Sequence, residues 1–303
     1  MADGPLAWWV YNKLARAEHH IATLDAEVTE FLDTRPFRMS SEFRENGDGT
    51  HIWVRRAQVK RFEGGTLALG DAVHNLSATL NYLVTSLWTS QDAEGDVLLA
   101  RFPILLDPHK FESTGKVHIK GLPAAAQDIV EGLQPYNRDN SSDPLWVLHY
   151  LDEIEKHRSI GLSNYTVLDT AVLDLGSMVN ARLISSQIFS GMFDDGAVLA
   201  EAQLQFLGDG PDGHEVYEEF PADITFKGTG PATGLFAVPT LAKIAAHIRT
   251  EVLPAFEPFA KEARPVPSLP DRLNEPETRS FQLSELGKFQ ELESAILAQP
   301  DEG

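Results

Sequence analysis

The sequence predicts an α+β protein with a helical-bundle core and an antiparallel β-sheet. Apolar residues recur every three or four positions, the spacing of one helix face, in three long segments: 7–32, 67–88 and 145–160. The segment 162–226 instead alternates apolar and polar residues between short Gly/Asp-rich turns, which is typical of consecutive antiparallel strands. A chain of 303 residues is long enough for one large domain or two modest ones.

We expect three parts along the chain. Residues 1–160 form the helical core, with a β-hairpin inserted at 38–62. Residues 161–263 form the antiparallel sheet and a C-terminal core helix that begins at Pro239. Residues 264–303 form a Pro-rich tail that could end in a helix, because the first half of this stretch has few apolar anchors.

Prolines and turn residues define the ends of the first elements. Arg35-Pro36 ends the first helix, since the residue before a proline avoids helical backbone. Asn-Gly-Asp-Gly at 46–49 lies between two strand-like runs and therefore predicts the tip of the hairpin. Thr66 follows two glycines and is the predicted cap of the second helix.

The second helix, 67–88, has two distinct faces. Its apolar stripe is Leu69, Val73, Leu76, Leu80, Leu83 and Leu87. At about 100° per residue, small and polar side chains lie away from this stripe. They are Asp71, His74, Asn75, Ala78, Asn81 and Tyr82. This second face could contact solvent or line a groove.

Shorter elements follow the second helix. We expect an extended segment at 102–104, a strand at 116–119 and a helix over 123–133. Asn-Ser-Ser-Asp-Pro at 140–144 is a cap and first-turn signal for the helix 145–160.

Composition excludes several classes of function. The chain has 25 Lys and Arg against 45 Asp and Glu, and its net charge of −20 disfavours nucleic acid as a partner. It contains no Cys, which removes disulfides, thiolate catalysis and Cys-based metal sites. Neither a signal peptide nor an apolar run of about 18 residues is evident. We therefore expect a soluble cytoplasmic protein that does not enter membranes.

A metal site is one hypothesis for the third helix. His149, Glu153 and His157 are spaced i, i+4 and i+8, and two imidazoles with a carboxylate can ligate zinc or another divalent ion. Asp71 and His74 on the second helix could add ligands. The favoured alternative is a solvated face with a Glu153–His157 pair, since the spacing differs from His-Glu-x-x-His.

A polar groove between the second and third helices is the other hypothesis. Arg158 next to the apolar stripe would need a buried acceptor, so we expect Arg158 or His157 to contact Asp71 or His74. An ion pair that joins the two helices is favoured over catalysis. The candidate ligand-binding residues are Asp71, His74, Asn75, Asp152, Lys156, His157 and Arg158.

Four short motifs occur in order along the chain: Gly-Asp-Ala-Val-His-Asn-Leu at 70–76, Phe-Pro-Ile at 102–104, Leu-Gln-Pro-Tyr at 133–136 and Lys-His-Arg at 156–158. As a set they resemble the motifs of one family of bacterial proteins that is frequent in actinobacteria. The resemblance covers roughly residues 8–160. The family has no assigned activity, so the resemblance implies relatives and not a function.

The chain departs from this family at several positions. Family members tend to carry Arg at the place of Ser77, Asp-His at Asn81-Tyr82 and Asn at Glu153. An Arg followed by a His on one helix is similar to the catalytic pair of HEPN-type ribonucleases. If the family is related to them, this chain lacks both members of the pair.

We therefore expect a protein that binds a small molecule or a protein partner through the polar groove. The alternative is a metal-assisted or acid/base hydrolase that uses the same residues, a relative of the HEPN ribonucleases without their Arg/His pair. The sequence identifies no cofactor and does not decide whether the protein is an enzyme.

Overall fold

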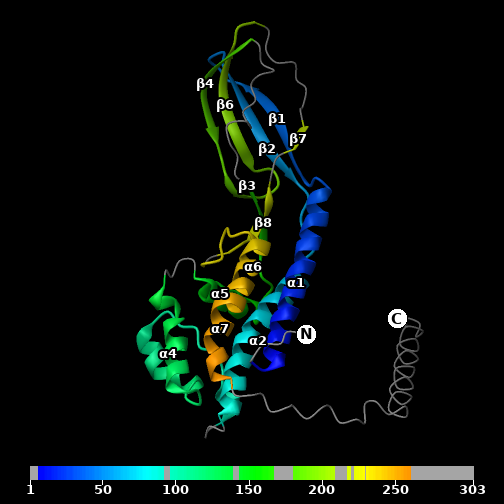
Figure 1. Ribbon diagram of the computed structural model, residues 1–303. Coiled ribbons are helices and arrows are strands. Elements are labelled where there is room, and N and C mark those ends of the chain that lie inside the picture. The colour runs from blue at the N-terminus through cyan, green and yellow to red at the C-terminus, as the bar shows by residue number, and fades with distance from the viewer. Residues whose placement is uncertain are drawn as a thin grey trace, which may run out of the picture. The chain divides into compact units, whose positions relative to one another are not determined.

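The computed structural model describes residues 6–91, 96–138, 143–166, 180–208, 217–219, 222–228 and 230–260. These residues belong to one compact unit that spans 1–261. They form helices and two antiparallel sheets (Figure 1), which confirms the predicted α+β class. The arrangement of the helices as a bundle stays a prediction, as does the division of the chain at residue 160. The predicted tail, 264–303, lies outside the described residues.

Helix α2 (Thr66–Ser90) packs against the three other long helices. These are α1 (Trp8–Asp33), α5 (Pro144–Glu155) and α6 (Ala237–His247). Every residue of the predicted α2 stripe is buried, from Leu69 to Leu87. The helical periodicity in the sequence therefore predicted the buried face of α2 correctly.

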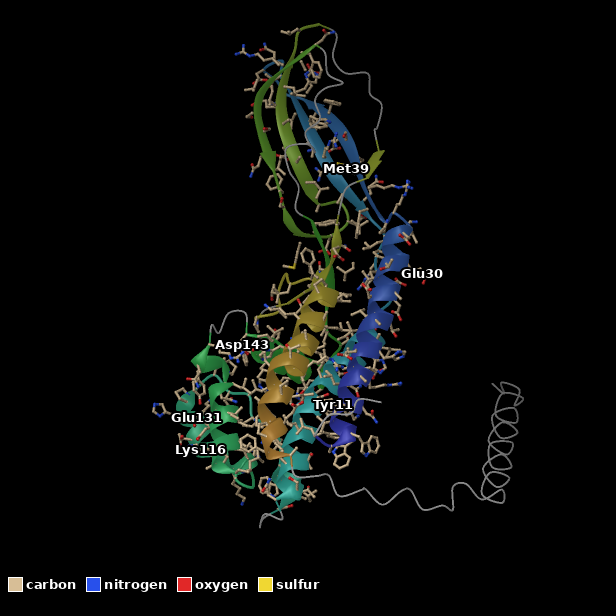
Figure 2. All side chains as sticks on the ribbon, viewed as in Figure 1. Tyr11, Glu30, Met39, Lys116, Glu131 and Asp143 are labelled. Atoms are coloured by element: carbon tan, nitrogen blue, oxygen red, sulfur yellow. The ribbon has the colours of Figure 1, made fainter. Side chains whose placement is uncertain are left out.

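The last helix continues beyond α6 with changes of pitch. A π-helical turn, η6 (Ile248–Val252), is followed by α7 (Leu253–Phe256) and the 3₁₀ turn η7 (Glu257–Phe259). Tyr11 of α1 donates a hydrogen bond from its hydroxyl to Glu257 Oε1 over 3.3 Å. Tyr11 lies in the first half of α1 (Figure 2), so this bond fastens α1 to the end of the helical run.

The five-stranded sheet confirms the hairpin and joins it to later strands. Its order is β4-β6-β2-β1-β7. The hairpin is β1 (Phe37–Glu45) and β2 (His51–Val59), and the others are β4 (Ala181–Ile188), β6 (Val198–Phe206) and β7 (Tyr217–Glu219). Each described pairing is antiparallel, as the short turns predict.

A second sheet of three strands has the order β5-β3-β8. Its strands are β3 (Leu162–Thr166), β5 (Gly191–Phe193) and β8 (Asp223–Phe226). Phe193 of β5 packs against Phe37 of β1, with 5.9 Å between the ring centroids. Aromatic packing therefore links the two sheets into the same core.

Short helices make up most of the segment 96–138. They are η1 (Val97–Leu99), α3 (Pro108–Lys110), η2 (Phe111–Gly115), η3 (Lys116–His118), α4 (Ala124–Gly132) and η4 (Pro135–Asn137). Helix α4 confirms the helix expected over 123–133. Lys116 and Glu131 lie close together (Figure 2), with Nζ 4.0 Å from Oε2, and join η3 to α4.

The strand predicted at 116–119 is wrong. The π-helix η2 runs directly into the 3₁₀ turn η3. Val117 and Ile119 alternate with polar residues as in a strand, but the turn buries Ile119 and leaves Val117 41% exposed. An alternation of apolar and polar residues over only four positions is compatible with one 3₁₀ turn as well as with a short strand.

The start of α2 differs from the prediction by one residue. Gly65, not Thr66, occupies the capping position, and its φ of +79° is one that residues with a Cβ rarely adopt. A Cβ at this position would lie 2.7 Å from Leu24 Cδ1. Gly65 is therefore required by both its backbone conformation and its contact with α1.

Helix α5 starts as predicted and ends early. Asp143 caps it, because Oδ1 accepts hydrogen bonds from the backbone N–H groups of Leu145 (2.9 Å) and Trp146 (3.0 Å). The helix ends at Glu155, short of the predicted residue 160. Residues 156–160 therefore do not lie on the helix face that the prediction assigned to them.

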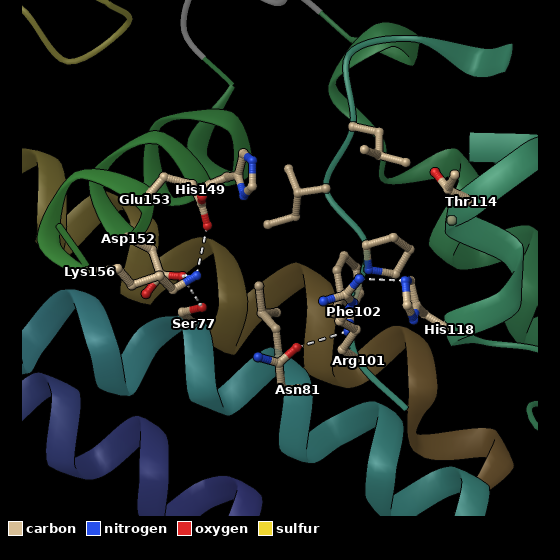
Figure 3. Close-up of a pocket in the computed structure, with 15 residues that line it drawn as sticks. Ser77, Asn81, Arg101, Phe102, Thr114, His118, His149, Asp152, Glu153 and Lys156 are labelled. Atoms are coloured by element: carbon tan, nitrogen blue, oxygen red, sulfur yellow. Dashed lines mark hydrogen bonds and ion pairs between the residues drawn. The ribbon is translucent and has the colours of Figure 1, made fainter. Parts of the chain in front are cut away.

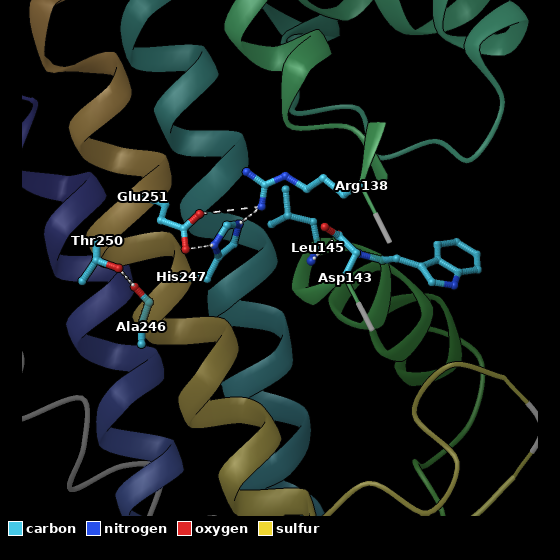
Figure 4. Close-up of polar contacts among 8 residues, drawn as sticks. Arg138, Asp143, Leu145, Ala246, His247, Thr250 and Glu251 are labelled. Carbon is cyan, nitrogen blue, oxygen red and sulfur yellow. Dashed lines mark hydrogen bonds and ion pairs between the residues drawn. The ribbon is translucent and has the colours of Figure 1, made fainter. Parts of the chain in front are cut away.

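A buried imidazole joins α6 to the segment before α5 (Figure 4). His247 Nδ1 lies 3.1 Å from Glu251 Oε1, and Arg138 Nη1 lies 3.7 Å from Glu251 Oε2. Glu251 is in η6, so its carboxylate contacts both basic side chains. The pKa of Glu251 is lowered, chiefly by the hydrogen bond with His247.

We predict that Gly121→Ala destabilises the protein by about 1–3 kcal/mol, the usual range for overpacking. A Cβ at Gly121 would overlap ring atoms of the buried Trp88, whereas a Cβ at Gly132 would meet nothing within 4 Å. Gly132→Ala is the matched control, and helix propensity predicts a change between zero and a gain of about 1 kcal/mol. Urea unfolding measures both; equal stabilities for the two variants would contradict the packing of Trp88 on Gly121.

Candidate functional site

The predicted site residues on α2 mostly face α1. Asp71 Oδ2 lies 3.8 Å from His20 Nδ1, and Asn75 Oδ1 accepts a hydrogen bond from Lys13 Nζ over 3.3 Å. Burial lowers the pKa of His20, and the nearby Asp71 carboxylate opposes this shift. Asp71 and Asn75 therefore belong to the contact between α1 and α2 and not to a groove beside α5.

The expected contact of Arg158 or His157 with Asp71 or His74 is wrong. His157 and Arg158 lie beyond α5, where both backbone N–H groups donate to Ile154 O, and both side chains are exposed. His74 is also exposed. The expectation extrapolated the α5 face past the residue where the helix ends.

The metal hypothesis finds no support in the described part of the chain. Among these residues, no three His, Asp or Glu side chains come together as a group that could hold a metal ion. His149 and Glu153 are one turn apart on α5, but His157 lies beyond the helix end. The i, i+4, i+8 spacing therefore does not correspond to a single helix face here.

Asp152 and Lys156 are the predicted residues that do lie where α2 and α5 meet (Figure 3). Ser77 Oγ on α2 donates to Asp152 Oδ2 over 3.0 Å. Lys156 Nζ lies 2.8 Å from Asp152 Oδ2 and 2.7 Å from Glu153 Oε1. The Asp152 side chain is 8% exposed, so its charge is stabilised by two partners at a buried position.

The two carboxylates hold Lys156 in its charged form. Burial acts to lower the pKa of Lys156, but the hydrogen bonds to Asp152 and Glu153 outweigh it, and the net shift is upward. The pKa of Glu153 is lowered because its carboxylate accepts a hydrogen bond from Lys156. This corner of the site therefore places the ammonium group of Lys156 between two acidic side chains.

A pocket of about 270 Å³ opens beside these residues. It is bounded by α2, by α5, by the extended segment 101–105 and by the turns η2 and η3. Its polar lining is Ser77, Asn81, Arg101, Thr114, His118, His149, Asp152, Glu153 and Lys156. Its apolar lining is Leu80, Phe102, Pro103, Ile104 and Leu105. We call this cavity the α2–α5 pocket.

Two side-chain amides hold the extended wall of the α2–α5 pocket. Asn81 Oδ1 accepts a hydrogen bond from the backbone N–H of Phe102 over 3.0 Å. Gln134 Oε1 accepts from the N–H of Leu105 (3.0 Å), while Gln134 Nε2 donates to the carbonyl of Pro103 (2.8 Å). Gln134 is fully buried, so its amide replaces the water that an extended backbone would otherwise need.

His149 faces the same pocket from α5 (Figure 3). Burial lowers the pKa of His149, and the carboxylate of Glu153 partly offsets the shift. The ring also packs beside Trp146, with 5.8 Å between ring centroids. His149 therefore presents an uncharged imidazole to the pocket at neutral pH.

Arg101 and His118 lie across the pocket from the carboxylates (Figure 3). Arg101 Nη2 lies 2.6 Å from His118 Nε2, and His118 Nδ1 lies 2.9 Å from the carbonyl oxygen of Leu99. Both contacts are satisfied when Nδ1 carries the ring proton, because Nδ1 then donates and Nε2 accepts. The imidazole thereby orients the guanidinium at the pocket wall.

This arrangement suits binding better than covalent catalysis. The Ser77 hydroxyl donates to a carboxylate that is already paired with Lys156, so it has no adjacent base that would activate it as a nucleophile. The pocket instead offers hydrogen-bonding groups on two sides and an apolar wall between them.

A second cavity, of about 640 Å³, lies where α2 begins and the smaller sheet starts. It is larger, but none of the candidate site residues line it. Its charged lining residues include Arg61, Asp194, Asp195 and Lys227, and Lys227 Nζ is 3.5 Å from Asp194 Oδ1. The α2–α5 pocket is the better candidate because it gathers buried and hydrogen-bonded polar groups.

The sequence did not indicate Arg101 and His118, which line the pocket, or Gln134, which holds its extended wall. They come from segments without a strong periodic pattern, and the fold brings them together. Ser77 and Asn81 had a usable signal, since they are polar residues four positions apart in a largely apolar helix.

The chain matches no family model, no curated protein and no solved structure. The resemblance to the actinobacterial family therefore stays a prediction. Within the described residues, no helix is both long and apolar enough to cross a membrane.

We predict that Ser77→Ala and Asp152→Ala are energetically coupled. Each variant removes the same hydrogen bond to a buried carboxylate, so the double variant should lose about 1 kcal/mol less stability than the sum of the single variants. Urea unfolding of the four proteins gives the coupling energy. The matched control is Asp71→Ala with Arg158→Ala, whose effects should add within about 0.5 kcal/mol. Coupling in the control pair, and none between Ser77 and Asp152, would contradict the structure and support the contact between Asp71 and Arg158 expected from the sequence.

Proposed function

We propose that the protein is a cytoplasmic binding protein that holds a small molecule in the α2–α5 pocket. The observation that carries this proposal is the lining of the pocket, where oriented polar groups on two sides flank an apolar wall. Sites for small molecules commonly combine apolar walls with a few fixed polar groups. The pocket lies beside the two motif helices, and it includes Asp152 and Lys156 of the residues expected to line a groove there.

The size of the pocket limits the ligand. A volume of about 270 Å³ is slightly below the usual range for ligand sites, which is roughly 300–1,000 Å³. A ligand with one ring or a short chain is therefore favoured over a nucleotide or a peptide. The net charge of −20 supports the same conclusion, because it disfavours polyanionic partners.

An acid/base hydrolase is the second candidate, and His149 is the observation that favours it. Its imidazole is uncharged near neutral pH and lies next to the Glu153 carboxylate, which are properties of a general base. The reaction would have to use water as the nucleophile, because the Ser77 hydroxyl donates its hydrogen bond to Asp152. Binding remains the primary proposal, since Ser77, Asp152, Glu153 and Lys156 already contact one another.

A fragment screen followed by two-dimensional NMR tests the proposal. We expect single-ring fragments to shift the backbone amide signals of residues that line the α2–α5 pocket, such as Asn81, Thr114 and Lys156. Thr114→Phe should reduce their affinity at least tenfold, because the larger side chain would occupy the pocket.

The matched control is Ser113→Phe. Ser113 and Thr114 are adjacent and exposed, and each hydroxyl donates to the carbonyl four residues earlier, but only Thr114 lines the pocket. Ser113→Phe should leave fragment binding unchanged. The proposal fails if no fragment shifts pocket signals, or if both variants weaken binding equally.

A further inference from the structure

We infer that the ligand of the α2–α5 pocket is a small carboxylate with an apolar body, and that Arg101 binds its carboxylate group. This inference rests on the proposed function and adds the chemical class of the ligand. It follows from the charges that line the pocket, from their pairing and from their positions on opposite walls (Figure 3).

Arg101 is the cationic group that remains available for a ligand. Its contacts within the described residues are to His118, through the guanidinium and the backbone, and none is to a carboxylate. One N–H of the guanidinium is used on His118 Nε2, which leaves other donors of its planar fork for a ligand. A guanidinium fork matches the two oxygens of a carboxylate.

Lys156 is not available in the same way. Its ammonium group lies 2.8 Å from Asp152 and 2.7 Å from Glu153, so it neutralises carboxylates of the protein itself. The wall formed by α5 therefore carries more negative than positive charge and would repel an anion. A ligand with a carboxylate should consequently place that group at Arg101, on the opposite wall.

The charge of the pocket lining also favours a monoanionic ligand over a phosphate. Arg101 and Lys156 balance Asp152 and Glu153, so the charged residues of the lining sum to zero. A dianionic phosphate would need a second unpaired cation, and the described lining offers Arg101 alone. A carboxylate needs only the one guanidinium.

The wall between the charged groups indicates the chemistry of the rest of the ligand, the part without the carboxylate. Phe102, Pro103, Ile104 and Leu105 form this wall, and the amides of Asn81 and Gln134 hold its backbone in place. The backbone groups of Phe102, Pro103 and Leu105 that accept or donate these bonds are therefore already satisfied. An apolar ring or chain is the part of a ligand that suits such a surface.

Three probes of matched size test the inference: phenylacetate, 2-phenylethanol and 2-phenylethylamine. They share a phenyl ring and a two-carbon chain and differ in the charge of the end group. By NMR titration of the full chain, we expect phenylacetate to bind at least tenfold more tightly than the alcohol and the amine. Arg101→Gln should weaken phenylacetate about tenfold and leave the alcohol unchanged.

Arg158→Gln is the matched control, because Arg158 is exposed and does not line the pocket. It should leave all three affinities unchanged. If the alcohol or the amine binds in the pocket as tightly as phenylacetate, or if Arg158→Gln has the same effect as Arg101→Gln, the inference is wrong and the proposed function stands. If neither these probes nor the screened fragments shift pocket signals, both fail.

Discussion

The burial of α2 among α1, α5 and α6 is the constraint on which the rest of the described structure depends. A helix covered on several sides can carry polar groups only where a neighbouring element satisfies them, because an unpaired buried polar group is destabilising. Three polar residues in the middle of α2 have such a partner. Asn75 accepts from Lys13 of α1, Ser77 donates to Asp152 of α5, and Asn81 accepts from a backbone amide.

These partners explain why a pocket forms beside α2 at all. An extended segment has backbone groups that need hydrogen bonds, and a neighbouring strand usually supplies them. Here Asn81 of α2 and the buried Gln134, which lies between α4 and η4, supply them, so 101–105 can lie as a wall without a partner strand. The space on the other side of this wall, towards Asp152 and His149, is the α2–α5 pocket.

The sequence predicted the elements that are determined locally. The α2 stripe and the hairpin follow from periodicity and turn residues, and the Asp143 cap follows from its place before Pro144. The end of α5 was not predictable in this way, because residues 156–160 contain neither glycine nor proline. Because the helix was expected to continue to residue 160, His157 and Arg158 were wrongly predicted to line the groove between the second and third helices.

The site was predicted only in part because its contacts join distant segments. Ser77 and Asp152 are 75 residues apart, and no periodic pattern relates them. Asp152 and Lys156 were found because both lie on the predicted helix, whereas Arg101 and His118 belong to short irregular elements. Such residues are found only when the packing of α2 against its neighbours is known.

Hydrogen exchange at the Phe102 and Leu105 amides tests most directly whether side-chain amides hold the pocket wall. The structure predicts that both amides are protected in the wild type. Asn81→Ala should then remove protection from Phe102, and Gln134→Ala should remove it from Leu105. If both amides already exchange in the wild type as fast as in an unstructured peptide, the wall is not held in this way, and the account of the α2–α5 pocket is wrong.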